Sequence, residues 1–495
     1  MNLAIDWRAE AAKLRFPDKA FIGGKFVPAA SGKTFECISP IDGKVLAKVA
    51  AGDKEDIDRA VAAARAAFDK GVWADKAPKQ RKRILQKLAE LIEKNADELA
   101  LLETLDMGKP IKNSRGSDVR AVIETVRWYA EAIDKIYDEI APTPKDQIAL
   151  ITREPLGVVG AVVPWNFPLL MTTWKFAPAL AAGNSIVIKP AEQSPMSALR
   201  IAELAMEAGI PEGVFNVVPG FGETAGQALG RHMDVDAITF TGSTEVGKLF
   251  LKYSGESNMK IVSLECGGKS PNIIFADAPD LTVAARDAAD GIFYNSGQVC
   301  TAASRLLVEE KIHDAFLSEV KKVADVYQPN DPLDPKTQMG SMVDKNQMER
   351  VLGYINKGKS EGAALAAGGK QVRQNSGGFY IEPTIFDRVK NDMTIAREEI
   401  FGPVLATLTF KNVEEAIRIA NDSIYGLQAS LWTNDLSKAH KTARALRAGT
   451  VTVNNMDGGG VEVPFGGYKQ SGVGRDKSLH ALDKYSQLKN TFIQL

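Results

Sequence analysis

The chemistry that this sequence could carry is concentrated first in one cysteine. Cys300 lies within FYNSGQVCTAASR, residues 293–305, among small and polar neighbours. A cysteine kept for packing usually lies in apolar surroundings, where its thiol is protonated and inert. Here the small residues leave room beside the sulfur, and nearby amides and hydroxyls can donate hydrogen bonds. The local sequence therefore leaves a nucleophilic thiol and a structural thiol both open.

Two glycine-rich turns could bind a phosphate group. GFGETAG (220–226) matches a Gly-x-Gly-x-x-Ala fingerprint, and TGSTEVG (241–247) joins an apolar run to a helical pattern. Free backbone N–H groups and the positive end of a helix dipole favour an anion at such junctions. Each turn could also be a plain tight turn followed by a helix N-cap. Two such turns in succession favour a nucleotide-binding site in this region.

A charged pair follows a third apolar run. Lys189 and Glu192 belong to SIVIKPAE, residues 185–192. Residues placed at the carboxyl end of a strand in an open sheet face the ligand, and a glutamate there typically accepts hydrogen bonds from ribose hydroxyls. Such a glutamate would repel a 2′-phosphate, which favours NAD over NADP. A solvated charge pair on a loop is the alternative interpretation.

The elements that must position these residues alternate between strands and helices. Residues 79–105 and 118–140 predict two helices in the first third of the chain. Strands are then predicted at 157–164, 185–190, 214–220, 236–242 and 260–265, with helices at 197–209 and 243–254. A second region has strands at 272–276, 305–310 and 403–410 and helices at 281–295 and 413–422. This alternation indicates two α/β lobes with parallel, doubly wound sheets, and it places Cys300 on a loop of the second lobe.

Composition excludes several classes of function. The 495 residues carry a net charge of −1, so neither nucleic-acid nor membrane-surface binding is expected. The N-terminus resembles no signal peptide, and no apolar run is long enough to span a bilayer. The three cysteines have neither disulfide nor zinc spacing, which predicts no metal site and fits a reducing, cytoplasmic environment.

Seven motifs together resemble the aldehyde dehydrogenase superfamily, from about residue 20 to the C-terminus. In chain order they are PWNFP (164–168), KPAE (189–192), FTGSTEVG (240–247), LECGGKSP (264–271), FYNSGQVC (293–300), EEIFGPV (398–404) and PFGGYKQSG (464–472). The resemblance implies a Rossmann-like NAD-binding domain over 1–135 and 157–264 and a catalytic domain over 265–466. It also implies a small β oligomerisation element from 136–156 and 481–495, through which such proteins form homotetramers or homodimers.

The β-prone runs at 142–155 and 491–495 agree with that element, since an exposed strand edge calls for a partner.

By this resemblance Cys300 is the nucleophile that attacks an aldehyde, giving a thiohemiacetal and then a thioester. Asn166 and the backbone N–H of Cys300 would stabilise the oxyanion. Glu265 would activate the water that hydrolyses the thioester, with its pKa raised by partial burial. Lys175 and Asp476 match positions linked to proton movement, although many relatives carry glutamate where this chain has Asp476.

The resemblance also assigns cofactor and substrate contacts. Lys189 and Glu192 would hold the adenosine ribose, and the pyrophosphate site resembles GSTEVG rather than GFGETAG. The remaining cofactor residues would be Trp165, Gly242, Ser243, Glu399 and Phe401. The substrate pocket would be formed by Phe167, Met171, Trp174, Tyr294, Asp457 and Phe465.

Departures from the family pattern bear on the substrate. Cys266 replaces a common leucine, either as a small buried filler or as a second redox-active thiol. Gly458–Gly460, flanked by Asp457 and Glu462, predict a wide polar entrance suited to polar or amine-bearing aldehydes. Several stretches outside the chemistry resemble the bacterial γ-glutamyl-γ-aminobutyraldehyde dehydrogenases of polyamine catabolism. The alternative is a broad enzyme for 3-hydroxypropionaldehyde, aminoaldehydes or simple aliphatic aldehydes.

Three other functions are less compatible with these residues. A CoA-acylating relative generally lacks the base that Glu265 would provide. A binding protein without activity has no reason to keep all of the motif residues. A thiol hydrolase needs a histidine beside Cys300, and none of the chain's four histidines lies in a motif next to it.

Overall fold

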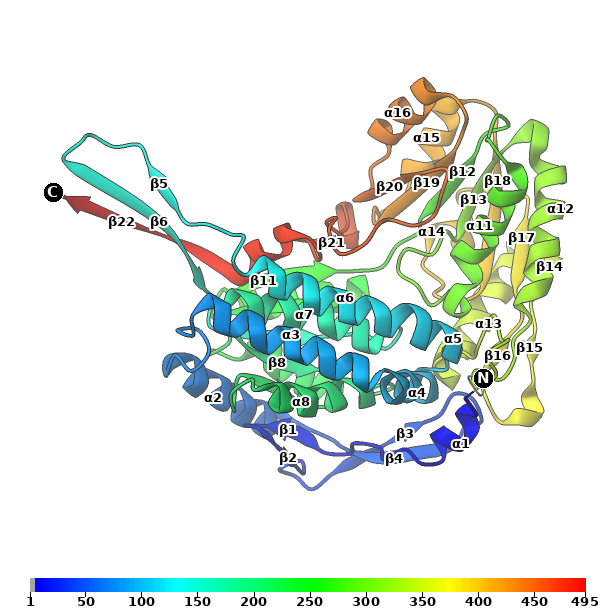
Figure 1. Ribbon diagram of the computed structural model, residues 1–495. Coiled ribbons are helices and arrows are strands. Elements are labelled where there is room, and N and C mark those ends of the chain that lie inside the picture. The colour runs from blue at the N-terminus through cyan, green and yellow to red at the C-terminus, as the bar shows by residue number, and fades with distance from the viewer. Residues whose placement is uncertain (1–4) are drawn as a thin grey trace.

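The first lobe is built on an eight-stranded sheet whose five central strands are parallel. A computed structural model describes residues 5–495 (Figure 1). The strand order is β2-β1-β9-β8-β7-β10-β11-β21, with antiparallel strands at both edges. The strands are β1 (Ala20–Ile22), β2 (Lys25–Val27), β7 (Val158–Val162), β8 (Ser185–Lys189), β9 (Phe215–Val217), β10 (Ala237–Thr241), β11 (Ile261–Glu265) and β21 (Gly472–Val473).

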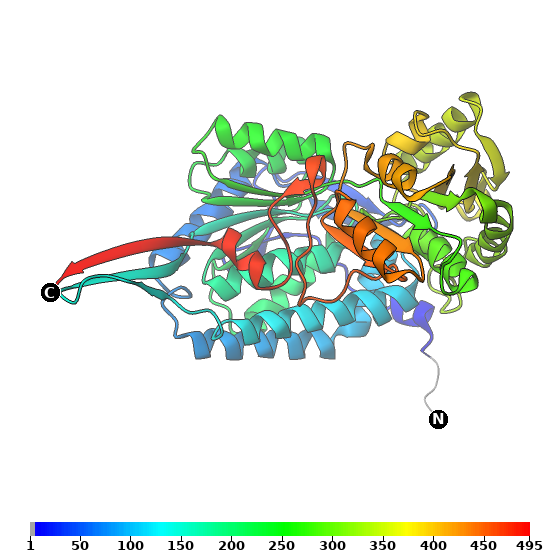
Figure 2. The ribbon, with the colours of Figure 1, turned by 90° about the horizontal axis from the view of Figure 1, so that it is seen from above.

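Helices cover both faces of this sheet, because its central strands have no solvent side. Every residue of β7, β8 and β10 is buried, as expected for parallel strands. Figure 2 shows α10 on one side of the sheet and α3 and α6 on the other. The helices of this lobe are α2 (Lys54–Asp69), α3 (Pro78–Lys94), α4 (Ala96–Met107), α6 (Val119–Ala132), α7 (Pro168–Ala182), α8 (Met196–Ala208), α9 (Gln227–Arg231) and α10 (Thr244–Gly255). The short elements α1 (Trp7–Ala11), β3 (Thr34–Ile38), β4 (Val45–Ala50) and α5 (Ile111–Asn113) complete it.

The strand order reverses between β7 and β10, and this position determines where a ligand can bind. From β7 the chain adds β8 and β9 on one side and then returns to add β10 and β11 on the other. A crevice forms at the carboxyl ends of strands where the order reverses in this way. The motif PWNFP follows β7 directly, and Gly242 and Ser243 follow β10. The topology therefore brings two of the sequence motifs to one crevice.

The second lobe contains a seven-stranded sheet in the order β14-β17-β18-β13-β12-β19-β20. All neighbours are parallel except β14 and β17. Its strands are β12 (Pro271–Ile274), β13 (Arg305–Glu309), β14 (Ala364–Ala367), β17 (Thr384–Asp387), β18 (Val404–Phe410), β19 (Gln428–Trp432) and β20 (Thr450–Val453). Its helices are α11 (Leu281–Phe293), α12 (His313–Ala324), α13 (Lys345–Ser360), α14 (Thr394–Arg397), α15 (Val413–Asn421) and α16 (Leu436–Ala445), and β15 (Gln371–Val372) pairs with β16 (Tyr380–Ile381). The predicted pair of α/β lobes is confirmed.

A three-stranded antiparallel sheet projects as an arm from the first lobe, on the side away from the second lobe (Figures 1 and 2). It contains β5 (Glu139–Ala141), β6 (Gln147–Pro155) and β22 (Ser486–Gln494). β22 pairs with β6 over its whole length, from Ser486 opposite Pro155 to Gln494 opposite Gln147. The first strand of the arm begins before the predicted run of 142–155.

Two predicted helices end differently in the structure. The helix predicted over 79–105 is two helices, because the Asn95 side chain donates to the carbonyl of Leu91 (2.7 Å) and ends α3. The helix predicted over 118–140 ends at Ala132, because the following residues turn toward the arm, where Asp138 accepts a hydrogen bond from the backbone of Arg153 (2.8 Å). Among the described residues, no helix is both long and apolar enough to cross a membrane.

The predicted domain bounds stay a prediction. One detail of the sheet differs from them, since β21 at Gly472–Val473 completes the first sheet although it lies far outside 157–264.

Candidate active site

A cavity of about 590 Å³ lies where the crevice of the first sheet faces the second lobe. Its walls come from the β7–α7 connection, the β10–α10 turn, the end of β11, the Cys300 loop, α13 and the segment before β18. The predicted site residues that line it are Trp165, Asn166, Phe167, Met171, Trp174, Gly242, Ser243, Glu265, Cys300, Glu399, Phe401 and Phe465. The sequence motifs that could do chemistry therefore meet around one space.

Six predicted residues lie outside that lining. Lys189 and Glu192 form an ion pair with each other (3.0 Å), and Lys189 is buried. Tyr294 stacks on Phe167, with ring centroids 6.4 Å apart, and so supports the wall from behind. Asp457 is exposed on its loop. Lys175 and Asp476 are both buried and pair with each other (2.5 Å).

The loop that carries Cys300 has a strained backbone before the cysteine. Asn295, Ser296 and Gly297 have φ values of 50°, 55° and 71°, which is the left-handed region. Such a conformation costs about 1–3 kcal/mol at each non-glycine residue and persists only where the surroundings impose it. Helix α11 consequently ends at Phe293 and not at residue 295 as predicted.

Buried hydrogen bonds impose this loop conformation. Gln298 is fully buried; its side-chain amide donates to Asn295 O (3.1 Å) and Ser341 O (3.3 Å), and its side-chain oxygen accepts from the backbone of Val343 (2.9 Å). Ser296 donates to Gly340 O (3.1 Å). Gln298 was not predicted as a site residue, although it belongs to the motif FYNSGQVC.

Asn166 is held against the same loop. Its side-chain amide donates to Gln298 O (2.9 Å), while its own carbonyl accepts from the side chain of Asn295 (3.0 Å). An amide nitrogen carries two N–H groups, and within residues 5–495 the second has no acceptor in range. Asn166 is thus oriented beside Cys300 with one donor available.

Glu265 ends β11 inside the cavity wall. It is buried, and neither carboxylate oxygen has a hydrogen-bond partner in the described part of the chain. Burial, reinforced by the nearby negative charge of Asp476, raises the pKa of Glu265 to about 8. Buried carboxylates are normally paired, so an unpaired one facing a cavity indicates a functional position.

The two cysteines at the cavity differ in their surroundings. Cys300 is half-buried, and desolvation by the cavity walls, with the negative charges of Glu265 and Glu399, raises the pKa of its thiol. Cys266 is buried in a hydrophobic cluster, where burial raises its pKa to about 12. A side-chain carbon added at Gly247 would lie 2.7 Å from the Cys266 sulfur, so this thiol packs closely against α10. That packing supports the interpretation of Cys266 as a small filler.

At the other side of the cavity lies the start of α10. Ser243 is the N-cap of this helix and accepts from the backbone of Val246 (3.3 Å). The N-terminal N–H groups of the helix can bind an anion. By contrast, the turn GFGETAG does not line the cavity.

Glu399 and Phe401 enter the cavity from the second lobe. Glu399 accepts from the backbone of Gly268 (3.0 Å), and burial raises its pKa to about 7. A side-chain carbon at Gly267 would lie 2.1 Å from the Glu399 carboxylate, so a larger residue there would displace that carboxylate. Phe401 has a φ of 58° and lies edge-on to Trp165, with centroids 5.2 Å apart. Backbone room, a helix N-terminus and aromatic rings together suit a dinucleotide.

Helix α13 supplies lining residues that the sequence analysis did not predict. Gln347, Arg350 and Tyr354 face the cavity from successive turns of this helix. Gln347 donates to the carbonyl of Phe401 (2.8 Å) and so holds its left-handed backbone. Their helical spacing was the only available signal, and it does not distinguish a cavity-facing stripe from a solvent face.

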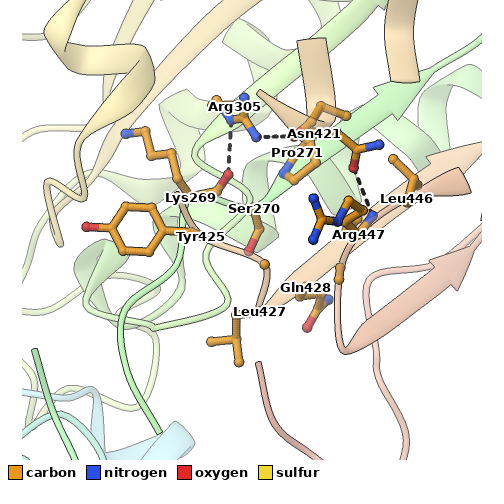
Figure 3. A pocket seen from close by; sticks show the side chains of 14 residues that line it. Lys269, Ser270, Pro271, Arg305, Asn421, Tyr425, Leu427, Gln428, Leu446 and Arg447 are labelled. Atoms are coloured by element: carbon orange, nitrogen blue, oxygen red, sulfur yellow. Dashed lines mark hydrogen bonds between the residues drawn. The ribbon is translucent and has the colours of Figure 1, made fainter. Parts of the chain in front are cut away.

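A second, much smaller cavity of about 10 Å³ lies in the second lobe (Figure 3). The Arg305 guanidinium is buried there and donates to three backbone carbonyls, those of Lys269 (3.0 Å), Ile419 (3.0 Å) and Ala420 (2.8 Å). Burial lowers the pKa of Lys269 to about 7. This volume is about that of one water molecule, which is too small for a substrate.

The two α/β lobes enclose a cleft lined by a thiol, an unpaired carboxylate and a helix N-terminus. This fold and site define the class: a two-lobed α/β protein with its site in the cleft. The model of the Aldehyde dehydrogenase family matches residues 26–491. The chain is 54% identical over 490 residues to the NADP/NAD-dependent aldehyde dehydrogenase PuuC of Escherichia coli (strain K12), covering 99% of this chain and 98% of that one.

Two solved structures are similar over 99% of both chains with a TM-score of 0.98. One is a mutant of the P. syringae indole-3-acetaldehyde dehydrogenase AldA in complex with NAD+ and IAA, at 60% identity. The other is the γ-glutamyl-γ-aminobutyraldehyde dehydrogenase of Burkholderia cenocepacia J2315, at 57% identity. The chain therefore belongs to the aldehyde dehydrogenase family.

Proposed function

We propose that this protein oxidises an aldehyde to a free carboxylic acid with NAD, through a covalent intermediate on Cys300. The observation that carries the proposal is the convergence of Cys300, Asn166 and the unpaired Glu265 on one cavity that also reaches the N-terminus of α10. Splitting the oxidation into attack, hydride loss and hydrolysis is the usual advantage of covalent catalysis.

In the first step, the Cys300 sulfur attacks the aldehyde carbon. The raised pKa of the thiol means that its proton must leave to solvent water as the carbon–sulfur bond forms. The oxyanion accepts from the second N–H of Asn166 and from the backbone N–H of Cys300. A single donor of this kind contributes about 3–4 kcal/mol to transition-state stabilisation.

NAD, when bound, supplies the hydride acceptor. Family membership and the NAD+ held by the AldA relative support its use here. Ser243 and the first turn of α10 would hold the pyrophosphate, and Glu399 and Phe401 would hold the nicotinamide riboside. Lys189 and Glu192, at the end of β8 and outside the large cavity, would hold the adenosine ribose.

Hydrolysis of the thioester is the task of Glu265. Its two free oxygens can bind and deprotonate a water, and a pKa of about 8 makes it a stronger base than an ordinary carboxylate. The buried Lys175–Asp476 ion pair lies near Glu265 and would relay the proton from Glu265 to solvent. The presence of this base in the cavity favours a free acid as product over transfer to CoA.

The substrate is a polar, amine-derived aldehyde such as γ-glutamyl-γ-aminobutyraldehyde. Asp457 and Glu462 are exposed on one loop, whose Gly459 carbonyl accepts from Lys477 (2.8 Å). The Lys477 ammonium lies 5.6 Å from the Trp174 ring and 5.8 Å from the Phe465 ring, and these rings line the cavity. Lys477 therefore connects the charged loop to the aromatic rings at the substrate end of the cavity.

A second candidate substrate is an aromatic acetaldehyde. The rings of Trp174 and Phe465 meet at 5.1 Å, and Phe167 and Met171 extend the same apolar wall. Such a wall suits a planar ring, and the relative AldA is named for indole-3-acetaldehyde.

NADH formation with purified protein tests the proposal. The panel contains γ-glutamyl-γ-aminobutyraldehyde, an aminoaldehyde, 3-hydroxypropionaldehyde, propionaldehyde and indole-3-acetaldehyde, with NAD and without CoA. Wild type should reduce NAD and Cys300→Ala should not. The γ-glutamyl compound should give the highest kcat/KM, and a higher value for the indole compound would favour the second candidate. No reduction with any aldehyde would contradict the proposal.

We further propose that the protein is a cytoplasmic homotetramer or homodimer assembled through the arm. Leu488, Phe492 and Leu495 on or beside β22 are 60%, 56% and 70% exposed, and an apolar strand edge of this kind is covered in stable proteins. The sedimentation of the purified protein would give the oligomeric state.

A further inference from the structure

A buried group of charges lies close enough to Glu265 to influence its pKa, and one member, Lys484, has no role in the proposed reaction. Asp476 is fully buried and accepts from Lys175 through one carboxylate oxygen (2.5 Å). Its other oxygen accepts from the ammonium of Lys484. Lys175 lies on α7, whereas Lys484 lies in the short 3-10 helix Leu479–Tyr485 that leads into β22 of the arm. Asp476 is thus held between two cations from different elements.

We propose that Lys484 is a positioning residue for the general base: it fixes Asp476 and balances its charge, so that Glu265 can ionise inside the cavity. This inference rests on the proposed function, because it assigns Lys484 a part in the hydrolysis step that Glu265 performs.

The buried charges near Glu265 must balance one another. Two carboxylates in a low-dielectric region repel each other unless cations compensate both. The ionisable groups that face Glu265 are Asp476, Lys175, Lys484, Arg475, Cys300 and Cys266. Lys175 alone can compensate only one of the two carboxylates.

The other nearby groups do not replace Lys484. Arg475 donates to the backbone carbonyls of Gly474 (2.7 Å) and Gly467 (3.3 Å) and is oriented by them. Tyr129, Tyr485 and Lys477 also face Asp476. The two tyrosines are kept neutral by burial, and Lys477 donates to Gly459. Lys484 is therefore the second cation bonded to Asp476.

The sign of the effect follows from this arrangement. Removing the Lys484 ammonium leaves Asp476 less compensated, which makes the ionised form of Glu265 less favourable and raises its pKa above about 8. A smaller fraction of the base is then ionised at every pH below the plateau. At high pH, where Glu265 is fully ionised in either protein, the difference disappears.

The experiment follows hydrolysis of an acyl group on Cys300 without NAD. p-Nitrophenyl acetate transfers its acetyl group to the Cys300 sulfur and releases p-nitrophenolate; water then attacks the thioester, Glu265 takes its proton, and acetate leaves. Decay of the acetylated full-length protein is measured by intact mass from about pH 6 to about pH 10. The variants are K484M, K484R and, as a matched control on the same arm, K489M, whose lysine pairs with Glu154 (2.5 Å) and is 58% exposed.

K484M should raise the apparent pKa of deacetylation by about one unit, with hydrolysis about tenfold slower near pH 6 and unchanged on the high-pH plateau. K484R and K489M should keep the wild-type profile. An unshifted pKa in K484M, or an equal loss of rate at every pH, would overturn the inference, since a purely structural role predicts the latter. If K484M does not fold, K484Q carries the same test. Absence of acetylation on Cys300 in the wild type would instead contradict the proposed function.

Discussion

Replacing Glu265 by glutamine separates the two halves of the proposed reaction. The substitution keeps the shape of the side chain and removes its charge and basicity. Because neither Glu265 oxygen has a hydrogen-bond partner, Glu265→Gln breaks no contact within the described residues. Hydride loss needs only a formed thiohemiacetal, whereas thioester hydrolysis needs the base. General-base catalysis typically contributes about 10²–10⁴-fold, and hydrolysis should slow by that factor.

The pKa of Glu265 also predicts the pH dependence of the wild type. With a pKa of about 8, roughly one tenth of Glu265 is ionised at pH 7. The rate of thioester hydrolysis should therefore increase about tenfold with each pH unit until the pH reaches about 8. The folded state binds the proton more tightly than the unfolded state, whose pKa is near 4.5. Stability contributed by the neutral carboxyl is therefore present below about pH 4.5 and is lost as the pH rises through about 8. Glu265→Gln should become more stable relative to wild type across that window.

Stopped-flow measurement of NADH checks the kinetic part. Glu265→Gln should give a burst of NADH close to one per active site, followed by a steady rate reduced by about 10²-fold or more. Thermal unfolding between about pH 5 and about pH 9 checks the linkage. An unchanged steady rate, or a burst lost together with it, would refute the assignment of Glu265 to hydrolysis.

Three further predictions concern other parts of the site and the arm. Asn166→Ala should lower kcat by about 10²–10³-fold and also lower stability by about 1 kcal/mol, because its buried hydrogen bond to Gln298 O is lost; steady-state kinetics and calorimetry measure the two effects. Gly267→Ala should raise KM for NAD, because its side-chain carbon would lie 2.1 Å from Glu399, while acetylation of Cys300 by p-nitrophenyl acetate stays near wild type. Phe492→Asp should sediment as a smaller species than wild type, since this 56% exposed residue lies on the arm through which assembly is proposed; an unchanged sedimentation coefficient would exclude β22 from the proposed interface.

Much of the fold could be predicted because the central strands are buried on both faces. Runs such as VVGAV in β7 and SIVIK in β8 are apolar almost throughout, which marks parallel strands in the sequence itself. Helix ends were less predictable. The break at Asn95 depends on a single side-chain cap, and the end of α6 depends on a contact with the distant β6.

The predicted residues that line the cavity follow strands, belong to other motif loops or lie on α7, whereas the lining residues on α13 were not predicted. Asn166 and Ser243 follow β7 and β10, so the reversal of strand order brings them together. Gln347 on α13 has no motif of its own. Lys484 lies eight residues from Asp476, and only the turn of a short 3-10 helix places its ammonium on that carboxylate. Contacts that depend on such folding have no signal in a single sequence.

The most direct test of the central claim is to trap the covalent intermediate. Glu265→Gln mixed with NAD and its best aldehyde should show, by intact mass and peptide mapping, an acyl group on Cys300 in an amount equal to the NADH formed. NADH formed without an acyl group on Cys300, or formed equally by Cys300→Ala, would contradict the mechanism.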